Sequence, residues 1–508
     1  MHDGQESELK FLFEPRDLSK IKALPLLKDA LPQANYQRLV STYFDTPNKY
    51  LWKHGVSLRV RQNEQGLVQT LKQQKSSALD RGEWEAKVNQ NLPDIDALKN
   101  TPLASFFKKR RVGERLQANF AVDVERLSIT LAIGKSRLEA AVDQGSVKAE
   151  GRSIPVNELE LELKEGEKIA LFELARAFCR NAPLRLSFIS KAELGYLLAD
   201  GAWGQALKAT QPQLAADMNC REAFEAICRC CMHDFMVNTH ALETSERVEA
   251  VHRGRIAIRR LRAGLQLFKP VVSDDAYQGL VDELKWLSDL FGDARDLDVF
   301  QEETFLPAAE DAGLAGGKEL AEYTETKRNA AHDAVNAAVK SDRLRVFLVD
   351  FFRWMEEGNW RQGTSAKPQK SVEDFARAAL KKRRKKLVKQ AANLADLDPR
   401  SRHKIRIKAK KLRYMVEFFK TLPKIADKPK VLTRFLRCLE ELQTRLGKIH
   451  DEEAKIAFLH EELHNLSEEA GHSAAFAAGV LATAPSDTNH QLERSIEAYS
   501  KLAKANPF

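Results

Sequence analysis

The run Glu158-Leu159-Glu160-Leu161-Glu162-Leu163-Lys164 alternates charged residues with leucines. Successive side chains of a β-strand point to opposite faces, so this run predicts a strand with one charged face and one leucine face. Buried charges of one sign are costly, so enclosed glutamates need basic neighbours or a bound cation. The run therefore predicts a sheet that packs apolar side chains on one side and gathers charges on the other.

The same alternation recurs through the first two hundred residues, at residues 6–13, 56–61, 83–88 and 136–143. One charged strand face usually points at water. Several such strands favour an antiparallel β-barrel of the α+β type. Its charged faces converge inside, and its apolar faces pack outward against helices such as the one expected at residues 169–179.

This mixture of acidic and basic side chains suits a triphosphate. Carboxylates hold a hard divalent cation such as Mg²⁺ or Mn²⁺, which bridges phosphate oxygens. Arginines and lysines neutralise the rest of the polyanion. Phosphoryl transfer to water needs mainly this positioning and charge stabilisation, so no protein nucleophile is required.

An ordered series of motifs covers nearly all of this first part. It reads Glu6-x-Glu8-x-Lys10, Tyr43-Phe44-Asp45-Thr46-Pro47, Leu58-Arg59-Val60-Arg61, Leu71-Lys72, Arg81-Gly82-Glu83-Trp84-Glu85, Ala141-Val142-Asp143-Gln144-Gly145, the run 158–164 and Ser190-Lys191. The series resembles a CYTH domain, a triphosphate tunnel metalloenzyme. The resemblance implies an eight-stranded antiparallel tunnel that cleaves a triphosphate with Mg²⁺ or Mn²⁺ as its cofactor.

The resemblance also implies roles for individual residues. Expected metal ligands are Glu6, Glu8, Glu160 and Glu162, and expected catalytic residues are Glu6, Glu8 and Lys10. The expected substrate-binding residues are Lys10, Arg59, Arg61, Lys72, Arg126 and Lys191. Further candidates for the tunnel wall are Asp143, Glu85, Arg110, Arg111 and Arg115.

Beyond Gln211-Pro212 the pattern changes to helical periodicity, and it contains an internal repeat. Residues 251–268 match residues 402–419 without a gap, at a constant offset of 151 residues. Each copy is followed by a second apolar helix and then by a short motif, Gly292-Asp293-Ala294-Arg295-Asp296 or Gly447-Lys448-Ile449-His450-Asp451. A duplicated helical unit, packed about a pseudo-twofold axis, explains this arrangement.

Each copy carries one basic stripe, which we call the first and the second basic stripe. The first consists of His252, Arg255, Arg259 and Arg262, and the second of His403, Arg406, Lys410 and Arg413. A basic helix stripe is usually a solvated face. Two copies in the same histidine-led register favour a binding surface for phosphate instead.

The repeat resembles a CHAD domain, a conserved-histidine α-helical domain. The resemblance implies two four-helix units around a basic groove that binds inorganic polyphosphate through both stripes. The expected organisation is a multidomain chain with a CYTH tunnel domain at residues 1–203, a linker at 204–213 and an all-α domain at 214–508. The two helical-bundle units of the latter are expected at about 214–360 and 370–508.

Composition agrees with polyanionic partners. The 508 residues carry a formal net charge of +9, and the pI is about 9.0. No long uncharged apolar run appears, so we expect a cytoplasmic protein without a membrane partner, associated with polyphosphate granules. The cysteines do not suggest a disulfide framework, and Cys228-x-x-Cys231 is expected to be a pair of buried thiols.

The order CYTH then CHAD resembles bacterial inorganic triphosphatases. We therefore expect metal-dependent hydrolysis of tripolyphosphate to pyrophosphate and phosphate in the tunnel, with polyphosphate bound by the helical domain. Adenylate cyclase and thiamine-triphosphatase activity remain alternatives, because such tunnels resemble one another. A non-catalytic polyphosphate-binding scaffold is an alternative of another class. Nucleic acid ranks low as a partner, because no aromatic platform is interleaved with the basic stripes.

Overall fold

The protein consists of two compact units in a computed structural model that describes residues 6–64, 66–74, 80–244, 246–311, 313–362, 371–484 and 487–508. Unit 1 contains residues 1–207 and 339–361, and unit 2 contains residues 208–338 and 362–508. Unit 1 thus includes a segment that we expected in the helical domain, and the domain boundaries stay a prediction. None of the described helices is both long and apolar enough to cross a membrane.

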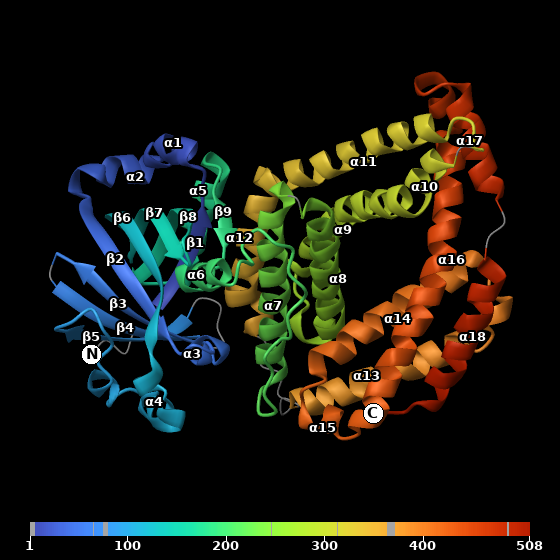
Figure 1. The fold of residues 1–508 in the computed structure, drawn as a ribbon. Coiled ribbons are helices and arrows are strands. Elements are labelled where there is room, and N and C mark those ends of the chain that lie inside the picture. The colour runs from blue at the N-terminus through green and yellow to red at the C-terminus, as the bar shows by residue number, and fades with distance from the viewer. Residues whose placement is uncertain are drawn as a thin grey trace. The chain divides into compact units, whose positions relative to one another are not determined.

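Unit 1 is built on one antiparallel sheet (Figure 1). Its strands are β1 (Glu6–Leu12), β2 (Asn35–Asp45), β3 (Val56–Asn63), β4 (Gly66–Gln74), β5 (Asp80–Val88), β6 (Gln117–Ile133), β7 (Ser136–Ala149), β8 (Arg152–Glu165) and β9 (Arg185–Ser187). They follow the order β5-β4-β3-β2-β6-β7-β8-β1-β9, and β1 also pairs with β5 at Glu6↔Arg81 and Ser7↔Asp80. The predicted strand-rich half is confirmed, and closure of the tunnel along its whole length stays a prediction.

Tight turns connect the long strands of this sheet. Gly134, at φ 58°, lies in the turn between β6 and β7, and Glu150 and Gly151 follow β7 at φ 49° and 71°. Two successive residues with positive φ are typical of the turns that match the right-handed twist of a hairpin. These turns keep β6, β7 and β8 in a register that places Arg126, Asp143 and Glu158 in one row.

Helices cover the apolar side of the sheet, as the alternation predicts. The helices of unit 1 are α1 (Leu18–Lys22), α2 (Pro25–Ala30), α3 (Tyr50–Lys53), α4 (Ala104–Lys108), α5 (Lys168–Asn181), α6 (Lys191–Ala199) and α12 (Asp342–Glu357). Helix α5 packs against β1 and β8, whose Phe11, Leu159 and Leu161 are fully buried. The charged residues of the same strands therefore face the other way.

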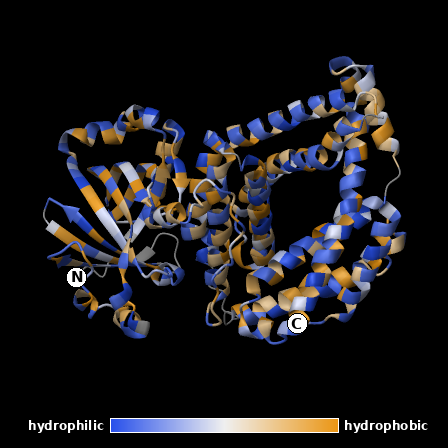
Figure 2. Cartoon of the chain, in the orientation of Figure 1, coloured by the Kyte–Doolittle hydropathy of each residue, from blue (hydrophilic) through white to orange (hydrophobic). Residues whose placement is uncertain are grey.

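Unit 2 is all helical. Its helices are α7 (Cys220–His240), α8 (Arg247–Val272), α9 (Tyr277–Phe300), α10 (Leu306–Glu310), α11 (Gly317–Lys340, whose last two residues belong to unit 1), α13 (Val372–Gln390), α14 (Pro399–Phe419), α15 (Pro423–Ala426), α16 (Pro429–Glu469), α17 (His472–Thr483) and α18 (Thr488–Lys504). The repeated segments form α8 with α9 and α14 with α16. Figure 2 shows hydrophobic and hydrophilic residues interspersed along the strands and long helices, as expected of elements buried on one face.

The two repeats meet in the core of unit 2. Helix α8 packs against α14, and Phe268 and Phe419, which occupy equivalent repeat positions, have ring centroids 6.2 Å apart. Cys228 and Cys231 are free and buried on α7, as expected.

One expectation about the repeat is wrong. The motifs that begin at Gly292 and Gly447 do not follow their helices but lie inside α9 and α16. Helix-favouring residues continue past both glycines, so neither glycine ends its helix.

Candidate functional site

The charged faces of the strands in unit 1 line one cavity of about 940 Å³. Residues from every strand from β1 to β8, and from the start of α6, contribute to its wall. The charged residues of the wall are Glu8, Lys10, Arg59, Arg61, Lys72, Glu83, Glu85, Arg126, Glu139, Glu160, Glu162, Lys164, Lys191 and Glu193. The cavity thus gathers side chains that are spread over almost two hundred positions of the sequence.

A buried cluster of three carboxylates lies on one side of this cavity. Oxygens of Asp143, Glu158 and Glu160 lie within 4.8 Å of one another. Lys191 neutralises them: its Nζ lies 2.8 Å from Asp143 Oδ2 and 2.7 Å from Glu160 Oε1, and it also donates to Glu158. Ser190, which caps the N-terminus of α6, fixes the backbone at this lysine.

Two more cations complete the cluster. Arg126 donates from Nε and Nη2 to the two oxygens of Asp143, both at 2.7 Å, and from Nη2 to Glu160 at 2.5 Å. Lys10 Nζ lies 3.5 Å from Glu158 Oε1 and donates to the carbonyl oxygen of Ile189. The two-pronged guanidinium contact fixes the orientation of Asp143 as well as its charge.

Glu160 and Lys191 stabilise each other's charged form. Burial raises the pKa of Glu160, but Lys191 and Arg126 outweigh burial and hold this pKa well below its usual range. Burial lowers the pKa of Lys191, but Asp143, Glu158 and Glu160 raise it well above its usual range. Every charge in the cluster therefore depends on its neighbours, and removal of one member leaves an uncompensated buried charge.

A second row of carboxylates lies next to this cluster. Strand register pairs Glu162 on β8 with Glu8 on β1 and with Glu139 on β7, so three glutamates share one row of three neighbouring strands. Lys164 Nζ lies 2.6 Å from Glu162 and 4.0 Å from Glu139. Paired residues of adjacent strands have Cβ atoms about 5 Å apart, so these carboxylates are neighbours on the cavity wall.

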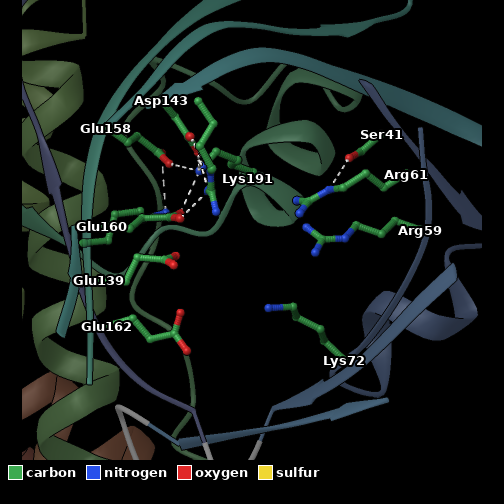
Figure 3. A network of polar contacts seen from close by, with 12 residues as sticks. Ser41, Arg59, Arg61, Lys72, Glu139, Asp143, Glu158, Glu160, Glu162 and Lys191 are labelled. Atoms are coloured by element: carbon green, nitrogen blue, oxygen red, sulfur yellow. Dashed lines mark hydrogen bonds and ion pairs between the residues drawn. The ribbon is translucent and has the colours of Figure 1, made fainter. Parts of the chain in front are cut away.

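Basic side chains occupy the opposite wall. Figure 3 shows Arg59, Arg61 and Lys72 pointing toward Glu139 and Glu162 across the cavity. Glu83 lies 2.9 Å from Lys72 and 3.9 Å from Arg59, and Arg61 Nε donates to the Ser41 hydroxyl at 3.2 Å. This wall carries more positive than negative charge.

The pKa shifts of residues at this wall show the same excess of positive charge. Burial, together with Arg59 and Arg126, lowers the pKa of Arg61 to about 10. Burial acts to raise the pKa of Tyr43, but Arg59 and Arg61 lower it overall. Arg59 Nε is buried without a hydrogen-bond partner among the described residues. A bound anion would relieve all three conditions.

The cavity brings together the residues that the strand motifs predict. Those that line it are Glu8, Lys10, Arg59, Arg61, Lys72, Glu85, Arg126, Glu160, Glu162 and Lys191. The side chain of Glu6 lies outside the part of the chain that the structure describes, as does that of Arg110. Arg111 and Arg115 are exposed, so Arg126 is the described arginine of residues 108–126 that faces the cavity. The roles assigned to these residues stay predictions.

Asp45, which belongs to the Tyr43–Pro47 motif, has a structural role. Its carboxylate accepts hydrogen bonds from the backbone of Leu51 and Trp52 at 2.9 and 3.0 Å, and from the Tyr196 hydroxyl at 2.6 Å. The motif therefore anchors α3 and α6 to β2.

Sequence reasoning missed Glu139 as a site residue and gave Glu158 no role. The signal for Glu139 is the alternation Glu139-Ala140-Ala141-Val142-Asp143, in which it lies two strand periods before the predicted Asp143. Its partner in the row, Glu162, is set by the β7–β8 register, which the sequence does not display.

The two basic stripes of unit 2 face a shared region. Arg255, Arg259, Arg406 and Lys410 are close enough to influence one another's protonation. Burial, followed by Arg259 and Arg406, lowers the pKa of Lys410 to about 6. Among the described residues, neither Lys410 nor Arg259 has a hydrogen bond or ion pair from its side chain.

The glycine motifs explain how two of these arginines are held. A Cβ built on Gly292 would lie 3.7 Å from Nη2 of Arg255, and one built on Gly447 would lie 3.6 Å from Nε of Arg406. Four residues later on each helix, an aspartate accepts from the same arginine: Asp296 from Arg255 at 2.7 Å and Asp451 from Arg406 at 3.4 Å. The two copies of the repeat thus share these side-chain contacts as well as their sequence pattern.

The remaining stripe residues differ in their surroundings. Arg413 Nη1 lies 3.3 Å from Glu417 and 3.7 Å from Glu440, so its charge is compensated. Arg262 lies near Lys411, whose pKa is lowered by burial and by this arginine. Burial and then Arg295 lower the pKa of His252 to about 4, and burial and then Arg406 lower that of His403.

Comparisons with known families agree with this division. A CYTH domain model matches residues 4–196 and a CHAD domain model matches residues 226–460. The inorganic triphosphatase of Haemophilus influenzae is 29% identical over 226 residues, which are 42% of this chain and 62% of that protein. The chain thus spans about three fifths of the length of this curated relative.

Solved structures resemble each half. The CHAD domain from the plant Ricinus communis is 29% identical, with a TM-score of 0.49 over 57% of this chain and 96% of its own. The PH1819 protein from Pyrococcus horikoshii is 18% identical, with a TM-score of 0.25 over 38% of this chain and 99% of its own. Both TM-scores are below 0.5, so neither structure supports an argument about the site.

Proposed function

The chain joins a CYTH domain to a CHAD domain in that order, and from this premise we propose that unit 1 hydrolyses inorganic triphosphate with a divalent cation, while unit 2 binds inorganic polyphosphate. One observation carries the first part. A row of carboxylates faces a basic wall, formed by Arg59, Arg61 and Lys72, across one cavity. A metal held by the carboxylates and a triphosphate held by the basic wall would match the charges of the two sides.

The row formed by Glu8, Glu139 and Glu162 fits a hard divalent cation. Two of its carboxylates, Glu139 and Glu162, already attract the ammonium group of Lys164, and oxygen ligands are those that a hard divalent cation prefers. The cluster at Asp143 fits less well, because Lys191, Arg126 and Lys10 neutralise it. When bound, Mg²⁺ or Mn²⁺ would supply positive charge to phosphate oxygens.

The chain's own residues account for the rest of the reaction. Arg59, Arg61 and Lys72 hold the phosphates and stabilise charge on the transferring group. Water forms a bond to the terminal phosphorus as the bond from that phosphorus to the bridging oxygen breaks, and pyrophosphate leaves. Lys10, fixed by the Ile189 carbonyl and Glu158, adds a cation on the acidic side.

In unit 2 the supporting observation is that Lys410 and Arg259, in the middle of the basic stripes, form no ion pair among the described residues. Burial and like charges disfavour the protonated form of Lys410 and the charged form of Arg259. A polyanion reverses both penalties, and the repeated phosphates of a long chain suit cations that the two repeats present close to one another.

Product analysis by ³¹P NMR with variants tests the first part. Glu8→Gln and Lys72→Met should each reduce turnover of tripolyphosphate by about 100-fold or more, because each removes a charge aimed into the cavity. Glu165→Gln and Lys148→Met, at exposed positions of β8 and β7, are matched controls that should retain turnover. Full activity in both cavity variants would contradict the proposal.

A further inference from the structure

Helix α12 belongs to unit 1, although residues 208–338 of unit 2 precede it in the sequence. It packs against α5, where Arg176 Nε donates to Asp350 at 2.7 Å over a separation of 174 residues. Two further polar contacts fix it: Arg345 Nε donates to the Cys179 carbonyl at 3.3 Å, and Lys168 Nζ lies 3.6 Å from Glu356. These contacts hold α12 in one rotation and one register against the catalytic sheet.

The rotation of α12 presents Phe352 to the cavity wall. Its ring is 1% exposed, and its centroid lies 4.3 Å from that of Phe188, with the planes tilted by 55°. Phe188 itself lines the cavity. Phe352 therefore lies directly behind a wall residue and does not line the cavity itself.

The segment around Phe188 holds two of the cations of the site. Ser187, just before it, pairs with Lys10 in the β1–β9 register. Ile189, just after it, accepts a hydrogen bond from Lys10 Nζ, and the next residues are the cap Ser190 and Lys191. A shift of the Phe188 ring thus moves the acceptor of Lys10 and the start of α6 together.

We propose that Phe352 is a positioning residue for the triphosphate site, acting through Phe188 on Lys10 and Lys191. The catalytic unit is then assembled from two separated parts of the chain, and residues 339–361 complete it. This inference rests on the proposed triphosphatase function. It goes beyond that function because, in the part of the chain that the structure describes, no residue after position 207 lines the cavity.

The test uses the full chain with Phe352→Leu, Phe188→Leu and the double variant. Phe347→Leu, a substitution at another buried phenylalanine of the same helix with no ring contact to Phe188 among the described residues, is the control. We expect Phe352→Leu to raise KM for tripolyphosphate about tenfold with little change in kcat, because partly misplaced cations weaken substrate binding. Partial unfolding alone lowers apparent kcat and leaves KM unchanged.

The double variant should resemble Phe188→Leu alone, because both substitutions act on one contact. The control should keep the KM of the unmodified chain at a comparable melting temperature. An unchanged KM in Phe352→Leu, with an active unmodified chain, overturns the positioning role and leaves the proposed function intact. An unmodified chain that neither binds nor hydrolyses tripolyphosphate overturns both.

Discussion

The ammonium group of Lys191 lies 2.7 Å from a carboxylate oxygen of Glu160 inside the cavity of unit 1. The lysine starts a helix and the glutamate lies on a strand, so the contact ties α6 to β8. Because Arg126 shares Glu160 and Asp143 with this lysine, the charges form a network in which each member compensates several others.

Glu160→Gln keeps the shape of the side chain and removes its charge. We expect the melting temperature to fall, because Arg126 and Lys191 lose a shared counter-ion in a buried site. Turnover of tripolyphosphate should fall about 100-fold, since both cations change position. Calorimetry and a phosphate-release assay measure the two effects. Glu165→Gln, in an exposed pair with Arg137, should change neither, and a stable, fully active Glu160→Gln would refute the role of the network.

Arg61→Met should change stability and binding in opposite directions. The pKa of Arg61 is lowered to about 10 by burial and by Arg59 and Arg126, so folding disfavours its charged form. Loss of that charge should raise the melting temperature, while KM for tripolyphosphate rises about tenfold. A lower melting temperature with unchanged KM would show that Arg61 is structural.

Polyphosphate binding by unit 2 should weaken as pH rises from 6 to 8. Burial and Arg259 lower the pKa of Lys410 to about 6, so the free protein holds it mostly neutral at pH 8. A polyanion favours the protonated form, and binding should therefore take up a proton. Titration calorimetry in buffers of different ionisation enthalpy measures that uptake, which Lys410→Met should reduce. The control Lys404→Met, at an exposed position, should keep it, and pH-independent binding would contradict the account.

The same lysine makes the free protein more stable as pH rises. Its pKa is about 6 in the folded chain and about 10.4 in an unfolded one. Between these values the unfolded chain binds more protons, so the free energy of unfolding increases with pH across this window. Thermal melts at pH 6.5 and 8.5 should show a smaller pH effect in Lys410→Met than in the unmodified chain. An equal effect would contradict the lowered pKa of Lys410.

Gly447 should tolerate alanine but not leucine. A Cβ there meets Arg406 at 3.6 Å, which is ordinary contact, and alanine favours helix by about 1 kcal/mol. Leucine would displace the guanidinium from Asp451 and weaken polyphosphate binding. Gly279→Leu, where no atom lies within 4 Å of a built Cβ, is the control. Equal polyphosphate affinity in Gly447→Leu and in the control would show that Gly447 is not needed to hold Arg406 against Asp451.

Alternation was enough to predict the strand-rich half and the charged wall. Glu160 and Lys10 lie in the cavity because side chains two apart share a strand face, which is a local property of the chain. Register is not local, and so the row that joins Glu139 to Glu8 and Glu162 became visible in the structure alone.

Helix α12 illustrates the same limit on a larger scale. Its sequence is amphipathic like that of its neighbours along the chain, and nothing in it distinguishes a partner in unit 1 from one in unit 2. The internal repeat, in contrast, could be predicted from the sequence, because residues at the same spacing in the two copies make the same contacts. The position of Gly292 and Gly447 was misjudged because a glycine at the end of an apolar run usually ends a helix.

Hydrolysis of tripolyphosphate by the purified full chain is the most direct test of the central claim. Initial rates would be measured with Mg²⁺, with Mn²⁺ and with a chelator, next to ATP and thiamine triphosphate at equal concentration. We expect equimolar phosphate and pyrophosphate from tripolyphosphate, dependence on added metal, and a higher kcat/KM than for either organic triphosphate. Tight polyphosphate binding without metal-dependent turnover of any triphosphate would contradict the account.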